Sequence, residues 1–213
     1  ELGTAVAKIN HDLRNSLASA QLVSDTLARS DDARVQKAAP RLERALTRAI
    51  TLATETLDYG KAMPQPAELE RVDLRQALDE AADEALAAWP SVEFVNNVHM
   101  MDHVMADPDH LHRIAANLIR NAAEAMSAAG SDPSRIFVSL ETNEVHFNDT
   151  GPGLPEKAAQ NLFTPFAGSS RQSGTGLGLV IARELAQSMG GDLVLSETGP
   201  DGSSFRLKLP PQG

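Results

Sequence analysis

Two asparagines in the second half of the chain share one face of an expected helix. Asn117 and Asn121 lie four residues apart, a spacing that puts two side chains one helical turn from each other. An amide oxygen is a hard, neutral ligand that suits a Mg²⁺ ion keeping water and phosphate oxygens as its other ligands. Asparagine pairs at this spacing are also common on helices that bind nothing, so the pair alone leaves both interpretations open.

A carboxylate followed by glycines comes directly after an expected strand. The segment is Asp149-Thr150-Gly151-Pro152-Gly153, and the strand is Val145–Asn148. A carboxylate at a strand end can accept a hydrogen bond from an exocyclic amine, and glycines let the backbone approach a flat ring. Considered by itself, the segment is better explained as a plain Asp-Gly turn.

A glycine-rich segment opens a later helix. Its residues are Gly174-Thr175-Gly176-Leu177-Gly178. Glycines at a helix N-terminus offer free backbone N–H groups and the positive end of the helix dipole to a phosphate. The segment is not a P-loop, because no Gly-Lys-Ser/Thr follows, and it lacks the βαβ context of a dinucleotide-binding fingerprint. The loop by itself leaves a phosphate ligand and a structural turn open.

The elements that would position these residues alternate between helix and strand patterns over residues 71–213. Strands adjacent in sequence, with helices grouped between them, predict an α+β sandwich whose mixed sheet carries its helices on one face. The expected helices are Leu74–Ala88, Pro108–Ala129 and Thr175–Met189. The expected strands are Val92–Val98, Ile136–Thr142, Val145–Asn148, Asp192–Ser196 and Ser204–Leu209.

Residues 1–60 carry two apolar seams with helical spacing, interrupted at Ser30-Asp31-Asp32, which can cap the second helix. This pattern predicts a helical hairpin. A single hairpin cannot bury both seams well, so we expect two hairpins to form a dimeric four-helix bundle, that is, a homodimer. The alternative is that the seams pack on the same chain's C-terminal part. Residues 61–70, with Pro64 and Pro66, are expected to be a linker.

Composition excludes several classes of protein. The 213 residues include 29 acidic and 19 basic side chains, a net charge of −10, which argues against a nucleic-acid partner. The chain has no cysteine, which excludes disulfides, thiol catalysis and thiolate zinc sites. Residues 1–60 are balanced in charge, so the whole acidic excess lies in residues 61–213. This shift supports a domain boundary near residue 60.

In their order and spacing, these segments resemble the bacterial two-component sensor histidine kinases, whose ATP-binding domain belongs to the GHKL superfamily. The resemblance covers nearly the whole chain. It identifies an N box at Asn117–Met126, a first glycine box at Asp149–Gly153, an F box at Leu162–Phe166 and a second glycine box at Gly174–Gly178.

The resemblance implies a binding site for ATP and Mg²⁺. In that family the residue at Asn121 holds Mg²⁺, the one at Asn117 supports the phosphates, and the one at Asp149 binds the adenine amino group, here with Ser203 beside it. Arg171 is either a contact to the γ-phosphate or a solvated loop cation. The other nucleotide-binding candidates are Gly151, Gly153, Phe166, Gly174, Thr175, Gly176, Leu177 and Gly178.

The segment Ile9–Leu17 resembles the family's H box. The resemblance implies that His11 is the phosphoacceptor. Asp12 is the candidate partner that fixes the imidazole tautomer, and Asn15, one helical turn after His11, corresponds to the position that orients a hydrolytic water on the partner regulator. The alternatives are a solvated histidine of the bundle and a surface asparagine.

The resemblance therefore implies a sensor histidine kinase core with domains at 1–60 and 71–213. Such a core autophosphorylates on His11 with Mg-ATP and passes the phosphoryl group to the receiver domain of a response regulator, which it also dephosphorylates. We expect this fragment in the cytoplasm, with any membrane attachment in other parts of the protein. The alternatives are a scaffold that does not use ATP and a different GHKL ATPase. The latter class carries a general-base Glu where this chain has Asn117.

Overall fold

The protein is described from a computed structural model. The structure describes residues 66–165 and 176–211, together with isolated residues between 20 and 49. Pro64–Ser170 and Gly178–Gly213 form one compact unit, and the fold below is that of this unit. The predicted hairpin, bundle and H box lie almost entirely outside the described residues. Within them, Asp32 accepts from the Arg34 backbone N–H at 2.7 Å, as expected of a helix cap.

A five-stranded mixed sheet forms one layer of this unit, with strand order β2-β4-β5-β7-β6. β2 pairs parallel with β4, and the remaining neighbours are antiparallel. The strands are β2 (Glu93–Asn96), β4 (Arg135–Glu141), β5 (Glu144–Asp149), β6 (Asp192–Gly199) and β7 (Gly202–Lys208). A separate antiparallel ribbon pairs β1 (Glu70–Asp73) with β3 (His103–Ala106).

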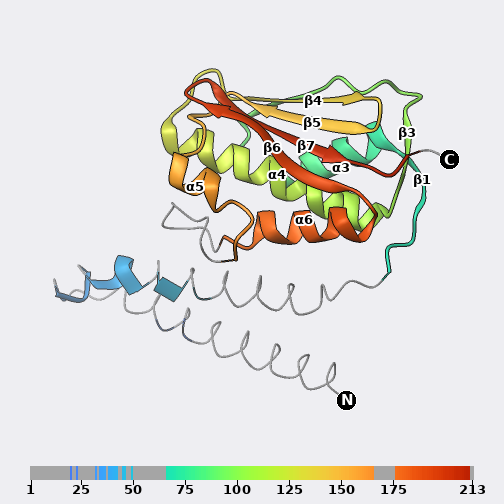
Figure 1. Cartoon of the computed structure of the whole chain (residues 1–213). Helices are drawn as coiled ribbons and strands as arrows, with labels where there is room; N and C mark the ends of the chain where they lie inside the picture. The colour runs from blue at the N-terminus through green and yellow to red at the C-terminus, as the bar shows by residue number, and fades with distance from the viewer. Residues whose placement is uncertain are drawn as a thin grey trace, which may run out of the picture. The chain divides into compact units, whose positions relative to one another are not determined.

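Three helices cover one face of the sheet (Figure 1): α3 (Leu74–Leu86), α4 (Pro108–Ala129) and α6 (Gly178–Ser188). A short fourth helix, α5 (Glu156–Gln160), precedes the F box. The predicted sandwich, with a mixed sheet and helices on one face, is confirmed for the described part of the chain. None of the helices in that part combines the length and apolar character needed to cross a membrane.

The core lies between the helices and the sheet. Side chains alternate along the strands, so that Ile136 and Val138 of β4 and Val145 and Phe147 of β5 are buried. Burying each such side chain contributes about 1.5–3 kcal/mol relative to leaving it exposed. Fully buried side chains from the helices complete this core: Leu74, Leu78, Leu111, Ile114, Ile119 and Met126.

Local signals set the bounds of α4, the helix that carries both asparagines. The Asp107 side chain caps its N-terminus by accepting from the His110 backbone N–H at 3.0 Å, and Pro108 is its first residue. Gly130 ends it with a φ of +65°. The predicted bounds of this helix are confirmed.

The start of one predicted helix needs correction, and three elements were not predicted. The helix after the second glycine box begins at Gly178 rather than Thr175, since Gly176 and Leu177 are not helical. The glycines at 176 and 178 disfavour helix nucleation, which delays the first turn. The sequence also missed β1, β3 and α5.

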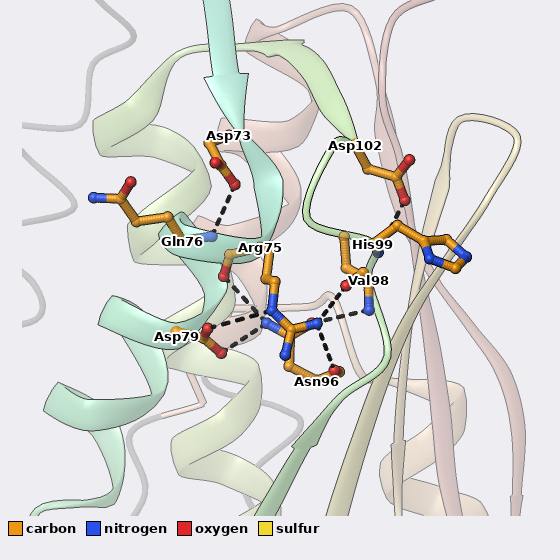
Figure 2. A network of polar contacts seen from close by, with 8 residues as sticks. All are labelled: Asp73, Arg75, Gln76, Asp79, Asn96, Val98, His99 and Asp102. Carbon is orange, nitrogen blue, oxygen red and sulfur yellow. Dashed lines mark hydrogen bonds and ion pairs between the residues drawn. The ribbon is translucent and has the colours of Figure 1, made fainter.

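A polar network fixes the start of α3 against the end of β2 (Figure 2). Arg75 Nη1 donates to the backbone carbonyls of Asn96 and Val98 at 3.2 and 2.5 Å. The Asn96 side chain donates to Asp79 Oδ1 at 2.7 Å and accepts from the Val98 backbone N–H at 3.1 Å. Because the network satisfies backbone carbonyls beyond the strand end, it holds the β2–β3 connection in place.

Candidate functional site

α4 brings the two asparagines to the side of the unit where α6 begins. Asn117 and Asn121 are both half-buried on this helix. A Cβ atom added to Gly178 would lie 3.3 Å from Asn117 Oδ1, a tight contact. Glycine at the start of α6 therefore allows the helix N-terminus to approach the Asn117 amide. The structure thus brings the N box together with the last residue of the second glycine box.

Asp149, the last residue of β5, has one carboxylate oxygen held by two backbone donors. Its Oδ1 accepts from the Gly151 N–H at 2.8 Å and from the Ser203 N–H at 3.3 Å. These two bonds join the first glycine box to β7 and orient the carboxylate, since hydrogen bonds to an ionised acceptor are strong. Ser203, one of the predicted site residues, acts here through its backbone.

Thr198 of β6 anchors the loop after Asp149 through a hydrogen bond. Thr198 Oγ1 accepts from the Leu154 backbone N–H at 2.7 Å and lies 3.1 Å from Ser203 Oγ. Gly153, within this loop, has a φ of +71°, and a Cβ there would lie 2.1 Å from the Gly199 carbonyl oxygen. A side chain at this position is excluded by both backbone conformation and space. Thr198 was not predicted as a site residue, because no local motif distinguishes it.

Thr150, also missed, anchors the end of β5 to the segment before β4. Its hydroxyl donates to the Pro133 carbonyl at 2.8 Å and accepts from the Arg135 N–H at 3.0 Å. The same hydroxyl lies 3.6 Å from Met126 Sδ on α4. Thr150 thereby fixes the neighbouring Asp149 relative to the helix that carries the asparagines.

The F box begins in a turn after α5. Leu162 is buried, and the Phe163 ring centroid lies 4.6 Å from Cζ of Arg183 on α6. Gly176 and Leu177 are described, and Leu177 is buried. The remaining predicted site residues lie outside the described part of the chain: His11, Asp12, Asn15, Phe166, Arg171, Gly174 and Thr175.

The donor set at Asn121 fits one kind of metal site. Among the described residues no group of three or more His, Cys, Asp and Glu side chains could enclose a cation. A neutral amide oxygen on a helix instead suits Mg²⁺ that arrives with phosphate oxygens and water as ligands. The geometry is thus compatible with a metal held jointly by the chain and a nucleotide.

Comparisons with known proteins identify the family of the chain. The family model described as "Histidine kinase-, DNA gyrase B-, and HSP90-like ATPase" matches residues 106–213. The adaptive-response sensory kinase SasA of Synechococcus sp. is 27% identical, over 96% of this chain and 58% of its own length. The sensory histidine kinase/phosphatase NtrB of Rhodobacter capsulatus is 26% identical, over 94% of this chain and 59% of its own length.

The fold recurs in solved structures. Full-length ShkA in complex with AMPPNP matches with a TM-score of 0.66 at 21% identity, covering 97% of this chain and 45% of that one. This chain spans less than two thirds of the length of SasA, NtrB and full-length ShkA. With the family model covering half of the sequence, the chain belongs to the histidine kinase-, DNA gyrase B- and HSP90-like ATPases, and its relatives within that family are two-component sensor histidine kinases.

Proposed function

We propose that the chain is an ATP-dependent protein-histidine kinase core. The observation that carries this proposal is the arrangement around Asp149, whose carboxylate is oriented by the N–H groups of Gly151 and Ser203. A carboxylate held in this way is suited to accept from the exocyclic amine of adenine. The Asn117 amide beside the start of α6 supports the phosphates at a helix N-terminus. Asn121 is the Mg²⁺ ligand.

In this proposal His11 is the nucleophile. One imidazole nitrogen attacks the γ-phosphorus in line, the new N–P bond forms as the bond to the β–γ bridging oxygen breaks, and ADP leaves with that electron pair. Asp12 accepts the other ring N–H and thereby fixes the tautomer. Mg²⁺, when bound, neutralises charge on the phosphate oxygens. The protein contributes mainly by positioning the reactants.

The phosphoryl group then passes to an aspartate of a response regulator. We propose that residues 1–60 form a hairpin that dimerises as a four-helix bundle, that 61–70 are a linker, and that 71–213 bind ATP. Asn15 orients the water that dephosphorylates the regulator, and the name of the relative NtrB, a kinase/phosphatase, supports this second activity. We place both reactions in the cytoplasm, as for two-component kinases.

Incubation of the full chain with γ-labelled ATP and Mg²⁺ tests the proposal. We expect an acid-labile label on the wild type, no label on His11→Ala, and full labelling of the control His99→Ala, whose side chain lies in the exposed β2–β3 connection. Asn121→Ala is expected to lose labelling because Mg²⁺ is lost. Absence of both label and nucleotide binding would identify a scaffold. ATP hydrolysis without label would identify another type of ATPase.

A further inference from the structure

One arginine connects three elements around the F box. Arg183 lies on α6, and its Nε and Nη2 donate to Oδ1 and Oδ2 of Asp192 at 2.9 and 3.1 Å. Its Cζ lies 4.6 Å from the centroid of the Phe163 ring. A single side chain thus joins the helix after the second glycine box, the first residue of β6 and the turn after α5.

Asp192 fixes the plane of the guanidinium group. The contact is bidentate, and Gln187 Nε2 also donates to Asp192 Oδ1 at 3.2 Å. The hydrogen bonds from Arg183 hold the pKa of the Asp192 carboxyl below its usual value of 3.8. Because the Nε–Nη2 edge of the guanidinium group is held by Asp192, its flat face is left to contact the aromatic ring.

The turn that contains Phe163 follows a very short helix. α5 is only five residues long, and the turn is closed by the Thr164 N–H donating to the Asn161 carbonyl at 3.0 Å. Ala158 and Leu162 are its buried side chains. Such a short segment has little intrinsic helical stability. The Arg183 contact therefore contributes substantially to where the F box lies relative to α6.

α6 is held differently, because one side of the helix is packed into the core. Its buried residues are Val180, Ile181, Ala182, Leu185 and Ala186. Arg183 comes five residues after Gly178, about 7.5 Å along the helix axis, and Gly178 is the residue that approaches Asn117. The Arg183 side chain thus connects the F-box turn to a helix that is packed into the core and whose first turn belongs to the candidate phosphate site.

We propose that Arg183 is a positioning residue of the nucleotide site, holding the F-box turn against α6 so that the phosphate-binding half of the site is assembled. This inference rests on the proposed function. It separates two halves of the site: Asp149 is oriented by backbone donors in the loop after β5 and on β7, so binding of the adenine is independent of Arg183.

Calorimetric dissociation constants for Mg-AMPPNP and for adenosine, measured on the full chain, test the inference. For Arg183→Gln we expect Mg-AMPPNP to bind about tenfold more weakly, with adenosine affinity unchanged within about twofold. Arg183→Lys is expected to be intermediate, because lysine keeps the cation but loses the bidentate fork. The matched control is Arg206→Gln, whose side chain is 38% exposed, against 35% for Arg183, and pairs with Glu144 on the sheet.

Phe163→Leu provides a second variant that removes the ring and keeps an apolar side chain. Phe163→Leu should weaken Mg-AMPPNP binding. The double variant with Arg183→Gln should bind Mg-AMPPNP little more weakly than either single variant, because both changes remove the same contact. Unchanged Mg-AMPPNP affinity in Arg183→Gln, or equal losses for both ligands, would overturn the inference. A wild-type chain that binds neither ligand would instead overturn the proposed function.

Discussion

At the scale of single residues, the Asp149 carboxylate is the group whose placement the structure explains most fully. Its Oδ1 accepts from two backbone N–H groups that belong to different elements. Thr150 next to it is tied to the segment before β4. A side chain fixed from both directions loses little further freedom on binding a ligand, which is the advantage of a preorganised site.

Replacing Asp149 by Asn tests its role in recognising the base. We expect Asp149→Asn to lower the affinity for Mg-ATP by about tenfold or more, since a hydrogen bond to a charged acceptor contributes roughly 1.5–3 kcal/mol. The amide oxygen of the variant is expected to keep the two backbone N–H groups that Oδ1 accepts now, so its NH2 group faces the adenine amine, which has no acceptor there. Affinity for Mg-GTP, which lacks that amine, should change less. Fluorescence titration with both nucleotides measures this. The control is Asp201→Asn in the exposed β6–β7 turn; equal losses for both nucleotides would argue against base recognition.

A glycine that is not among the candidate nucleotide-binding residues is as tightly constrained as those that are. Gly202 has a φ of +134°, and a Cβ there would lie 1.8 Å from the Asp149 carbonyl oxygen. Gly190 also has a positive φ, +83°, but nothing lies within 4 Å of its Cβ position. The two glycines therefore separate the cost of backbone conformation from the cost of a steric clash.

We expect Gly190→Ala to lower the free energy of unfolding by about 1–2 kcal/mol, the usual cost of a left-handed alanine. Gly202→Ala should cost clearly more, because β7 must also move away from the end of β5. Urea unfolding followed by circular dichroism measures both variants. Equal losses would mean that the strand pair accommodates the added carbon without strain.

At the scale of elements, the start of α4 is coupled to the chain segment that enters the unit. Asp107 Oδ1 accepts from the His110 N–H and Oδ2 from the Glu68 N–H, both at 3.0 Å. Burial raises the pKa of Asp107, but hydrogen bonds from the backbone N–H groups of His110 and Glu68 lower it and outweigh the effect of burial. The pKa of Asp107 therefore lies below 3.8. The β1–β3 ribbon, in which Glu70 pairs with Ala106, reinforces the same connection.

Asp107→Ala should destabilise the unit more than Asp73→Ala does. Both residues cap a helix through one backbone N–H, in α4 and α3 respectively, and losing a cap costs about 0.5–2 kcal/mol. Asp107 loses the bond from Glu68 as well, about 0.5–1.5 kcal/mol more. Urea midpoints of the two variants give the comparison, and an equal shift would show that the Glu68 bond contributes nothing.

The pH dependence of the Asp107→Ala effect follows from the depressed pKa. The stability that the carboxylate contributes is present above its unfolded value near 3.8 and is lost as the pH falls through the lower folded pKa. The difference between wild type and Asp107→Ala should therefore shrink in acid. A difference that persists below that pH would show that the carboxylate charge is not involved.

The elements that the sequence predicted correctly are those with local signals. Asp107, Pro108 and Gly130 delimit α4, and the turn at Asn143 separates β4 from β5. β1 was missed because three of its four residues are charged, and β3 because its four residues are too few to show a period. β2 is equally short, but it lies within the longer strand-like stretch Val92–Val98. The same holds for the candidate site. The glycines after Asp149 form a motif that can be recognised in the sequence, whereas the contacts of Thr198 form only in the folded chain.

At the scale of the whole molecule, residues 61–213 and the proposed ligand both carry a net negative charge. Residues 61–213 hold 21 acidic and 11 basic side chains, and Mg-ATP is an anion. The net charge of this part of the chain therefore opposes the approach of the nucleotide. In the proposed site, affinity comes from short-range groups: the amide of Asn117, the backbone N–H groups at the start of α6, and the Mg²⁺ ion that we propose Asn121 holds.

The salt dependence of nucleotide binding distinguishes this arrangement from a basic patch. Raising the ionic strength from about 10 mM to about 150 mM shortens the Debye length from roughly 30 Å to about 8 Å, which screens the repulsion between two anions more than it weakens contacts at hydrogen-bond distance. We expect the dissociation constant of Mg-AMPPNP, at fixed free Mg²⁺, to fall by up to about threefold. Adenosine, which is uncharged, should show no change and serves as the control. A dissociation constant that rises severalfold with salt would mean that cationic side chains attract the phosphates over a distance, contrary to a site built from amides and a metal.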